Sequence, residues 1–329
     1  MKANSILKLI PVKELEFLAA ETKVDYQVKK LKGSSIFRLI LYSMLNSTKV
    51  SLRIMEHFYN SATFKQFTGE NHNSTKYNSL SDRIASINSE YFEKIFHLLS
   101  KKFSHLLKEK NSLILFDSTM VGISSKLVSW GMKVGVKTNK RQIKYTVGLK
   151  GTLPCHVSIF TTPTASSEDK TIPPAIFSYK PPKENIVVFD RGVQSRKTFR
   201  ELNDKNIQFV TRIKKDAVYK IISQNKIPLK SIDSTVTISE DLIVQLRETH
   251  KGKWNSTKFR LVKAKSDETG DELYFLTNIH DLDPYEIAFI YKKRWEIEVF
   301  FKFLKQELNL SHIVSRNENG VKVMIYMTL

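Results

Sequence analysis

The sequence has too little cysteine for cross-links and no apolar stretch long enough to span a membrane. Cys155 is the only cysteine in 329 residues, so neither a disulfide framework nor a zinc site with several cysteines can form. No stretch approaches the ~18 apolar residues of a transmembrane helix. Lys8, Lys13 and Glu14 interrupt the apolar run at the N-terminus, which is too short for a signal peptide. We therefore expect a cytoplasmic protein with no membrane contact.

Several catalytic signatures are also missing. The sequence contains no GxxxxGK[ST], GxSxG or HExxH segment, which argues against P-loop, serine-hydrolase and zincin chemistry. Cys155 and His156 are adjacent, but neighbouring residues of a strand point to opposite faces, so they would not form a thiol–imidazole pair. The eight histidines show no metal-ligand spacing.

Acidic residues are scarce, and the net charge is +20. Residues 118–167 contain no Asp or Glu, but they do contain Lys126, Lys133, Lys137, Lys140, Arg141, Lys144 and Lys150. Such a stretch is typical of a surface that tracks a phosphate backbone, although a generic basic surface is the alternative. Within it we select Lys137, Lys140, Arg141 and Lys144 as DNA contacts. Trp130 and Tyr145 either stack on bases or, as is commoner for aromatics, lie in the core.

Apolar periodicity predicts a helical segment over residues 1–110. Ile36, Leu39, Ile40 and Met44 recur at helical spacing, and glycine and proline are scarce here. Short helices separated by polar turns suit a helix-turn-helix-like DNA-binding module, but they suit a plain helical bundle about as well.

From residue 111 the pattern changes to short apolar or alternating runs, typical of an α/β domain over 111–213. The expected strands are 112–116, 142–150, 153–160, 186–189 and 207–213, with a helix at 195–204. Residues 214–278 are β-rich, with expected strands at 235–238, 242–247, 257–265 and 272–278.

The segment 279–329 is expected to open with one long helix. Asp283 suits the N-cap, Pro284 the first turn and Glu286 a capping box. Apolar residues lie on most of its sides, so we expect it to be largely buried.

The same helix carries a polar stripe. Tyr291, Arg294, Glu298 and Lys305 are separated by three, four and seven residues, which places them within about 60° of one another on a helix. A stripe of this kind can hold a metal ion with its carboxylate and a phosphate backbone with its cations.

Glu298 has two acidic counterparts. Asp117 and Asp190 each follow a short apolar strand, and the sites of open α/β sheets lie at the carboxyl ends of strands. Three converging carboxylates suit two Mg²⁺ ions about 3.5–4 Å apart. For a single aspartate the alternative is a turn or helix cap.

These features resemble one family. The stripe is similar to the tyrosine–arginine–glutamate–lysine signature of the IS-four-type insertion-sequence transposases, which are bacterial DDE cut-and-paste enzymes. The segments FDSTMV, VVFDRG and FVTRIK also look like that family, and the resemblance covers about 112–329. Two departures are Val193, where the family often has an aromatic residue, and the end of the chain in the apolar run VMIYMTL, where relatives generally continue into further helices.

The resemblance implies a ribonuclease-H-like catalytic core with a β-rich insertion at 214–278, preceded by a helical N-terminal domain that binds DNA ends. It implies Asp117, Asp190 and Glu298 as the catalytic, Mg²⁺-binding triad, with Mn²⁺ able to replace Mg²⁺. Tyr291, Arg294 and Lys305 would contact phosphates, and Trp295 would contact a base.

The function implied is magnesium-dependent cleavage at terminal inverted repeats and strand transfer into target DNA, by a homodimer in the nucleoid. The alternatives are a truncated, catalytically silent DNA-binding copy and a hydrolytic nuclease of the same fold.

Overall fold

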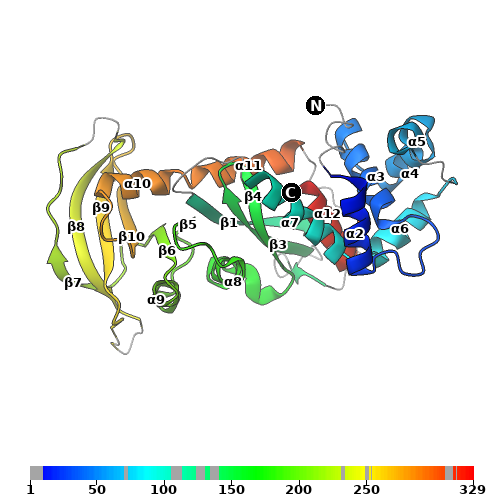
Figure 1. The fold of residues 1–329 in the computed structure, drawn as a ribbon. Helices are drawn as coiled ribbons and strands as arrows, with labels where there is room; N and C mark the ends of the chain where they lie inside the picture. The colour runs from blue at the N-terminus through cyan, green and yellow to red at the C-terminus, as the bar shows by residue number, and fades with distance from the viewer. Residues whose placement is uncertain are drawn as a thin grey trace.

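The computed structural model describes residues 10–69, 73–104, 113–123, 130–133, 141–230, 234–248, 252, 254–307, 314–315 and 317–329. Figure 1 shows an elongated arrangement, with the N-terminal helices at one end, a long twisted sheet reaching the other, and α10 and α11 crossing between them. Within the described residues, no helix has the length and apolar character needed to cross a membrane.

The N-terminal part is helical, as expected. Its helices are α2 (Val12–Thr22), α3 (Gly33–Asn46), α4 (Leu52–Asn60), α5 (Ala62–Thr68), α6 (Tyr77–Ser86) and α7 (Glu90–Ser104). Ser51 and Ser61 cap α4 and α5 by accepting backbone N–H bonds. The apolar run near the end of the sequence forms α12 (Glu318–Thr328), whose Val323 and Met324 pack into the core of these helices.

The first half of the sheet is an antiparallel group followed by two parallel strands. β1 (Leu113–Ile123), β3 (Arg141–Lys150) and β4 (Leu153–Phe160) pair antiparallel, with the short β2 (Met132–Lys133) beside β3. β5 (Ile186–Phe189) pairs parallel with β1, and β6 (Gln208–Arg212) pairs parallel with β5. The strands at 153–160 and 186–189 have the predicted bounds.

Side chains alternate between the two faces of this sheet. Ile114 and Phe116 share one core with α8 (Ile172–Tyr179) and α9 (Arg196–Asp204), whereas Leu115 faces a second core with α10 and α11. The two buried faces explain why the central strands read as continuous apolar runs.

The second half of the sheet comes from residues expected to be β-rich. They form β7 (Tyr219–Gln224), β8 (Val236–Leu246), β9 (Phe259–Ser266) and β10 (Glu272–Thr277). β10 pairs antiparallel with β6, so these strands extend one ten-stranded sheet. The two strands expected at 235–238 and 242–247 are one strand, β8, with a register shift between Ile238 and Glu240. β7 was not predicted.

The long helix begins as predicted but is broken. Asp283 Oδ1 accepts a 2.8 Å bond from the Tyr285 N–H and starts α10 (Pro284–Lys292). The chain then tightens into i→i+3 bonds, among them Arg294 N–H to Tyr291 O at 3.0 Å, before α11 (Trp295–Glu307). The break separates Tyr291 from Glu298, and no glycine or proline marks it in the sequence.

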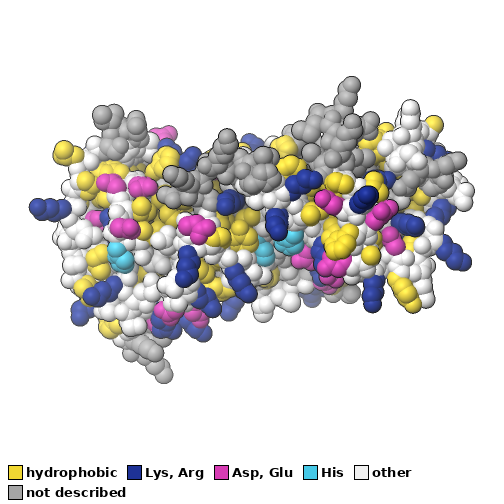
Figure 2. Space-filling view, viewed as in Figure 1, with side chains coloured by type: hydrophobic (Ala, Val, Ile, Leu, Met, Phe, Trp, Pro, Cys, Tyr) yellow, Lys and Arg dark blue, Asp and Glu magenta, His cyan; other side chains and the backbone are white. Residues whose placement is uncertain are grey.

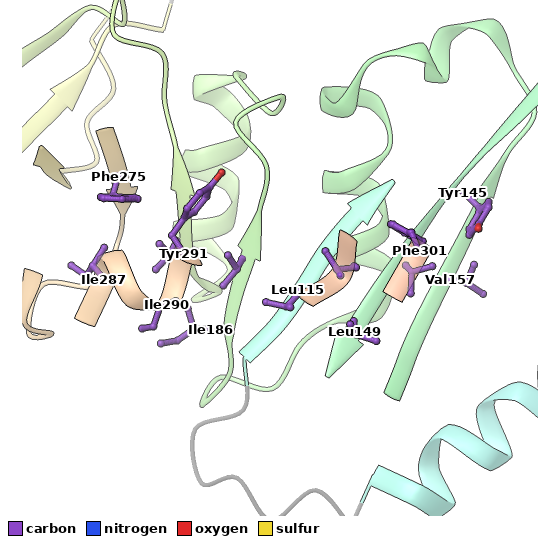
Figure 3. Close-up of a cluster of buried hydrophobic side chains, with 14 of the residues drawn as sticks. Leu115, Tyr145, Leu149, Val157, Ile186, Phe275, Ile287, Ile290, Tyr291 and Phe301 are labelled. Carbon is purple, nitrogen blue, oxygen red and sulfur yellow. The ribbon is translucent and has the colours of Figure 1, made fainter. Parts of the chain in front are cut away.

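The expectation that this helix is largely buried is wrong for α11. Ile297, Phe301 and Leu304 face the core, and Phe301 points toward Leu149 and Tyr145 in Figure 3. The opposite side carries three apolar residues that are at least half exposed, namely Trp295 (63%), Val299 (51%) and Phe303 (50%). Only one side of α11 therefore meets the sheet.

Candidate active site

Two of the three predicted carboxylates follow neighbouring strands. The parallel pairing of β1 with β5 ends at Phe116 and Phe189, and Asp117 and Asp190 are the next residues of each strand. The expectation that the first strand ends at Asp117 is wrong, because residues 117–123 stay paired with β3. The two aspartates nevertheless lie side by side at the edge where parallel pairing stops.

Burial is the largest influence on the pKa of Asp117. It raises the pKa of Asp117 to about 7, although the Ser118 N–H and the Arg294 guanidinium act in the opposite direction. The nearby carboxylates of Glu168 and Asp190 raise the pKa further. A half-buried group of acids of this kind is stable in its charged form only beside a cation.

In this structure the cation is Arg294. Its Nη2 lies 2.5 Å from Glu298 Oε1, and its Nη1 lies 3.9 Å from Asp117 Oδ2. The guanidinium also lies over the ring of Tyr291 at 5.7 Å, and Nε is buried without a hydrogen-bond partner. Three members of the predicted stripe therefore meet, and Glu298 reaches Asp117 only through Arg294.

The donor set fits a hard divalent cation only in part. Asp117 and Asp190 offer adjacent carboxylate oxygens, which Mg²⁺ prefers. Within the described ranges, however, no three His, Cys, Asp or Glu side chains are grouped closely enough to hold a metal ion. The Glu298 carboxylate is paired with Arg294 in this structure.

A polar cleft of about 880 Å³ opens beside the aspartates. Asp271 and Glu272 lie in its lining, and Glu272 pairs with Lys215 at 2.5 Å. Asp190, Tyr291 and Arg294 line it together with Arg191, Arg212 and Lys215. These three cations were not among the predicted site residues. Arg191 and Arg212 were already present in the segments VVFDRG and FVTRIK, at the ends of β5 and β6, so the sequence did hold a signal for them.

The residues of the predicted basic stretch differ in their exposure to solvent. Lys144 is only 1% exposed, and its ammonium donates to Glu168 Oε1 at 2.7 Å and to Ser166 O at 3.1 Å. Its prediction as a DNA contact is wrong, because β3 is covered on both faces. Arg141 is half-buried and donates to Gly131 O. Lys137 and Lys140 lie outside the described residues.

The aromatic residues considered as base contacts also differ in their exposure. Tyr145 is fully buried and Trp130 packs against the same core, so the core alternative is right for Tyr145. Trp295 and Lys305 are exposed, at the start and in the last turn of α11. On the face shown in Figure 2, Lys and Arg side chains are spread along the molecule with acidic ones among them. This face does not show one continuous basic stripe.

Fold and site together define a mixed α/β protein with a pair of neighbouring aspartates beside a polar cleft that charged groups of both signs line. Residues 108–329 match the family model described as the transposase DDE domain, and the chain belongs to that family. The family agrees with the resemblance to insertion-sequence transposases found in the sequence.

Curated relatives carry transposase names. The chain is 28% identical over 142 residues to the y4zB transposase of Sinorhizobium fredii, covering 43% of this chain and 39% of that protein. It is 27% identical over 243 residues to a Synechocystis transposase for insertion sequence element IS4SA, covering 71% and 63%. A transposase for element IS5377 of Geobacillus stearothermophilus is 23% identical over 84% and 73%. The chain thus spans less than two thirds of the first two relatives.

Among solved structures, a piggyBac transposase synaptic complex with hairpin DNA is similar at 10% identity and a TM-score of 0.43. The similarity covers 95% of this chain and 70% of that one, and is too low to define the fold.

Proposed function

We propose that this protein cuts DNA at the terminal inverted repeats of its own insertion sequence and joins the freed 3′ ends to target DNA. Membership of the transposase DDE domain family supports the general class. One observation carries the finer proposal: Asp190, the neighbour of Asp117 across the end of the parallel pairing, lines a cleft that Arg191, Arg212 and Lys215 also line. Carboxylates for chemistry and cations for phosphates thus share one opening.

The arrangement of strands supports a ribonuclease-H-like core. Three antiparallel strands (β1, β3 and β4) and two parallel strands (β5 and β6) are covered by helices on both faces. The strands β7–β10 enter between Asp190 and Glu298, where the resemblance to IS-four-type transposases implies an insertion.

Asp117, Asp190 and Glu298 would hold Mg²⁺, or Mn²⁺ in its place, and two ions are expected. When bound, such ions activate water or a 3′ hydroxyl and stabilise the leaving oxygen. Arg294 neutralises the acids in the structure described here. In the working site it would turn from Glu298 to a DNA phosphate, which can accept two bonds from the guanidinium.

The remaining proposed DNA contacts are charged or aromatic side chains that line the cleft or are exposed to solvent. Arg191, Arg212 and Lys215 line the cleft and would bind phosphates, while Lys305 and Trp295 on α11 are free to meet DNA beyond it. Tyr291 is buried between Arg294 and Arg212, whose guanidinium carbons lie 5.7 and 5.8 Å from its ring. It therefore orients these cations. The N-terminal helices would bind the DNA end, and a homodimer would pair the two ends.

One observation favours a second candidate, a catalytically silent DNA-binding copy. Glu298 is held by Arg294 at 2.5 Å, and the described residues hold no ready-made metal group. If the contact never opens, the protein would occupy DNA ends without cutting them.

The test uses the DNA that flanks the gene. A duplex carrying the matched inverted repeats is incubated with the protein and Mg²⁺, with EDTA and a scrambled repeat as controls. We expect Mg²⁺-dependent cuts at the repeat ends and joined products on target DNA. Binding without cuts would support the silent copy, and cuts without joined products would support a hydrolytic nuclease.

A further inference from the structure

The turn η3 (Glu168–Lys170) lies between β4 and α8 along the chain and contacts the loop after Asp190. Its side chains reach β3 and the loop after Asp190, and Thr171, the next residue, reaches Ser118. None of these contacts was expected from the sequence, where Glu168 only marks the end of the acid-free stretch.

Asp169 holds the loop that follows Asp190. Its Oδ1 accepts the backbone N–H groups of Gln194 at 2.8 Å and of Ser195 at 2.9 Å. Ser195 in turn caps α9 by accepting the Thr198 N–H. One carboxylate thus fixes both the course of this loop and the start of α9, where a negative charge is also favoured by the helix dipole.

Glu168 packs against the same loop from the other side. Buried Lys144 fixes its carboxylate at 2.7 Å. A Cβ built on Gly192 would lie 2.6 Å from Glu168 Cγ and 3.5 Å from Asp190 Oδ2. The loop therefore passes against Glu168 at a glycine, two residues after Asp190, with no room for a side chain between them.

Thr171, directly after the turn, reaches the segment of Asp117. Its hydroxyl lies 3.2 Å from Ser118 Oγ, which lies 2.7 Å from Thr146 Oγ1. The backbone N–H of Ser118 donates to Asp117 Oδ1 at 2.7 Å. The same short segment thus braces the surroundings of both aspartates.

We propose that residues 168–171 are a positioning element that sets Asp190 against Asp117, with Asp169 as its principal positioning residue. The inference rests on the proposed function, because the separation of the two aspartates matters only if they hold metal ions together. Partners outside the ligands commonly tune metal sites in this way. The alternative is that Asp169 is a helix cap with no influence on the site.

The test compares Asp169→Ala with Asp169→Asn, which keeps an oxygen that can accept both N–H bonds. The control is Asp25→Ala, which removes another acid that accepts a backbone N–H, from Gly33 at 2.7 Å, in the helical part of the chain. Mn²⁺ affinity is measured by electron paramagnetic resonance titration, amide exchange at Gln194 and Ser195 by mass spectrometry, and folding by thermal melts.

We expect Asp169→Ala to weaken Mn²⁺ binding about tenfold or more, the loss usual for an outer partner of a metal site, and to speed exchange at both amides. Asp169→Asn should restore both properties, and Asp25→Ala should lower only the melting temperature. Unchanged Mn²⁺ affinity in folded Asp169→Ala would overturn the positioning role and leave the proposed function intact. If the unaltered protein bound no Mn²⁺, the proposed function and this inference would both fall.

Discussion

The buried ion pair of Lys144 with Glu168 leads to a prediction opposite to that of a DNA contact. Lys144→Met keeps the aliphatic stem but leaves the Glu168 carboxylate without its cation, near the carboxylates of Asp117 and Asp190. Breaking a buried pair costs 3–5 kcal/mol in general, and since Glu168 is 26% exposed we expect a loss of about 3 kcal/mol in the free energy of unfolding. The double variant Lys144→Met with Glu168→Gln should recover most of this loss, because no unpaired charge remains.

The assay is urea unfolding alongside DNA affinity at several salt concentrations. Lys133→Met is the matched control, since Lys133 is an exposed lysine on neighbouring β2 and its replacement should change stability by no more than about 0.5 kcal/mol. Our reasoning would be refuted if Lys144→Met kept the stability of the unaltered protein. If, in addition, the slope of log DNA affinity against log salt concentration became shallower by about one unit, Lys144 would be a phosphate contact.

Three further predictions concern other charged groups. Burial lowers the pKa of His156 to about 4, so the free energy of unfolding should fall by about 3 kcal/mol as the pH drops from 6.5 to 4. In urea unfolding at each pH, His156→Gln should remove this pH dependence. Arg260→Leu leaves the buried carboxylate of Asp241 without its cation and should lower the free energy of unfolding by about 3–5 kcal/mol. The double variant with Asp241→Leu should lose less, as measured by chemical denaturation. Arg294→Ala removes the partner of Glu298 and the cation that faces Asp117 at a half-buried site, so the melting temperature should fall, and cleavage by the protein that remains folded should fall much further. Normal cleavage per folded molecule would contradict its role.

Much of the fold was predictable because local pattern and environment agree. The strands 153–160 and 186–189 and the start of α10 at its Asp-Pro cap all match the structure. β7 was missed because it is an edge strand with mostly exposed side chains and therefore lacks a clear apolar pattern. The break after α10 was missed because no glycine or proline marks it in the sequence.

The positions of the acidic residues of the site were predictable from the sequence, and those of its cationic residues were less so. Asp117 and Asp190 could be paired because both follow buried strands, and strand ends meet at one edge of a sheet. Lys144 could not be told from exposed Lys133 by sequence, since its burial depends on Glu168, which lies beyond the next strand. Arg294 illustrates the same limit: the stripe predicted that it lies on the same side of the helix as Glu298, but the sequence carried no sign of its approach to Asp117.

The central claim is that Asp117, Asp190 and Glu298 cut DNA together. The most direct measurement is Mg²⁺-dependent cleavage of a duplex carrying the inverted repeats, by the unaltered protein and by the variants Asp117→Asn, Asp190→Asn and Glu298→Gln, with binding measured on the same samples. We predict that each variant binds the duplex at least as tightly as the unaltered protein and does not cut it. Cleavage at the unaltered rate by any one of them would show that this residue is not part of the catalytic centre.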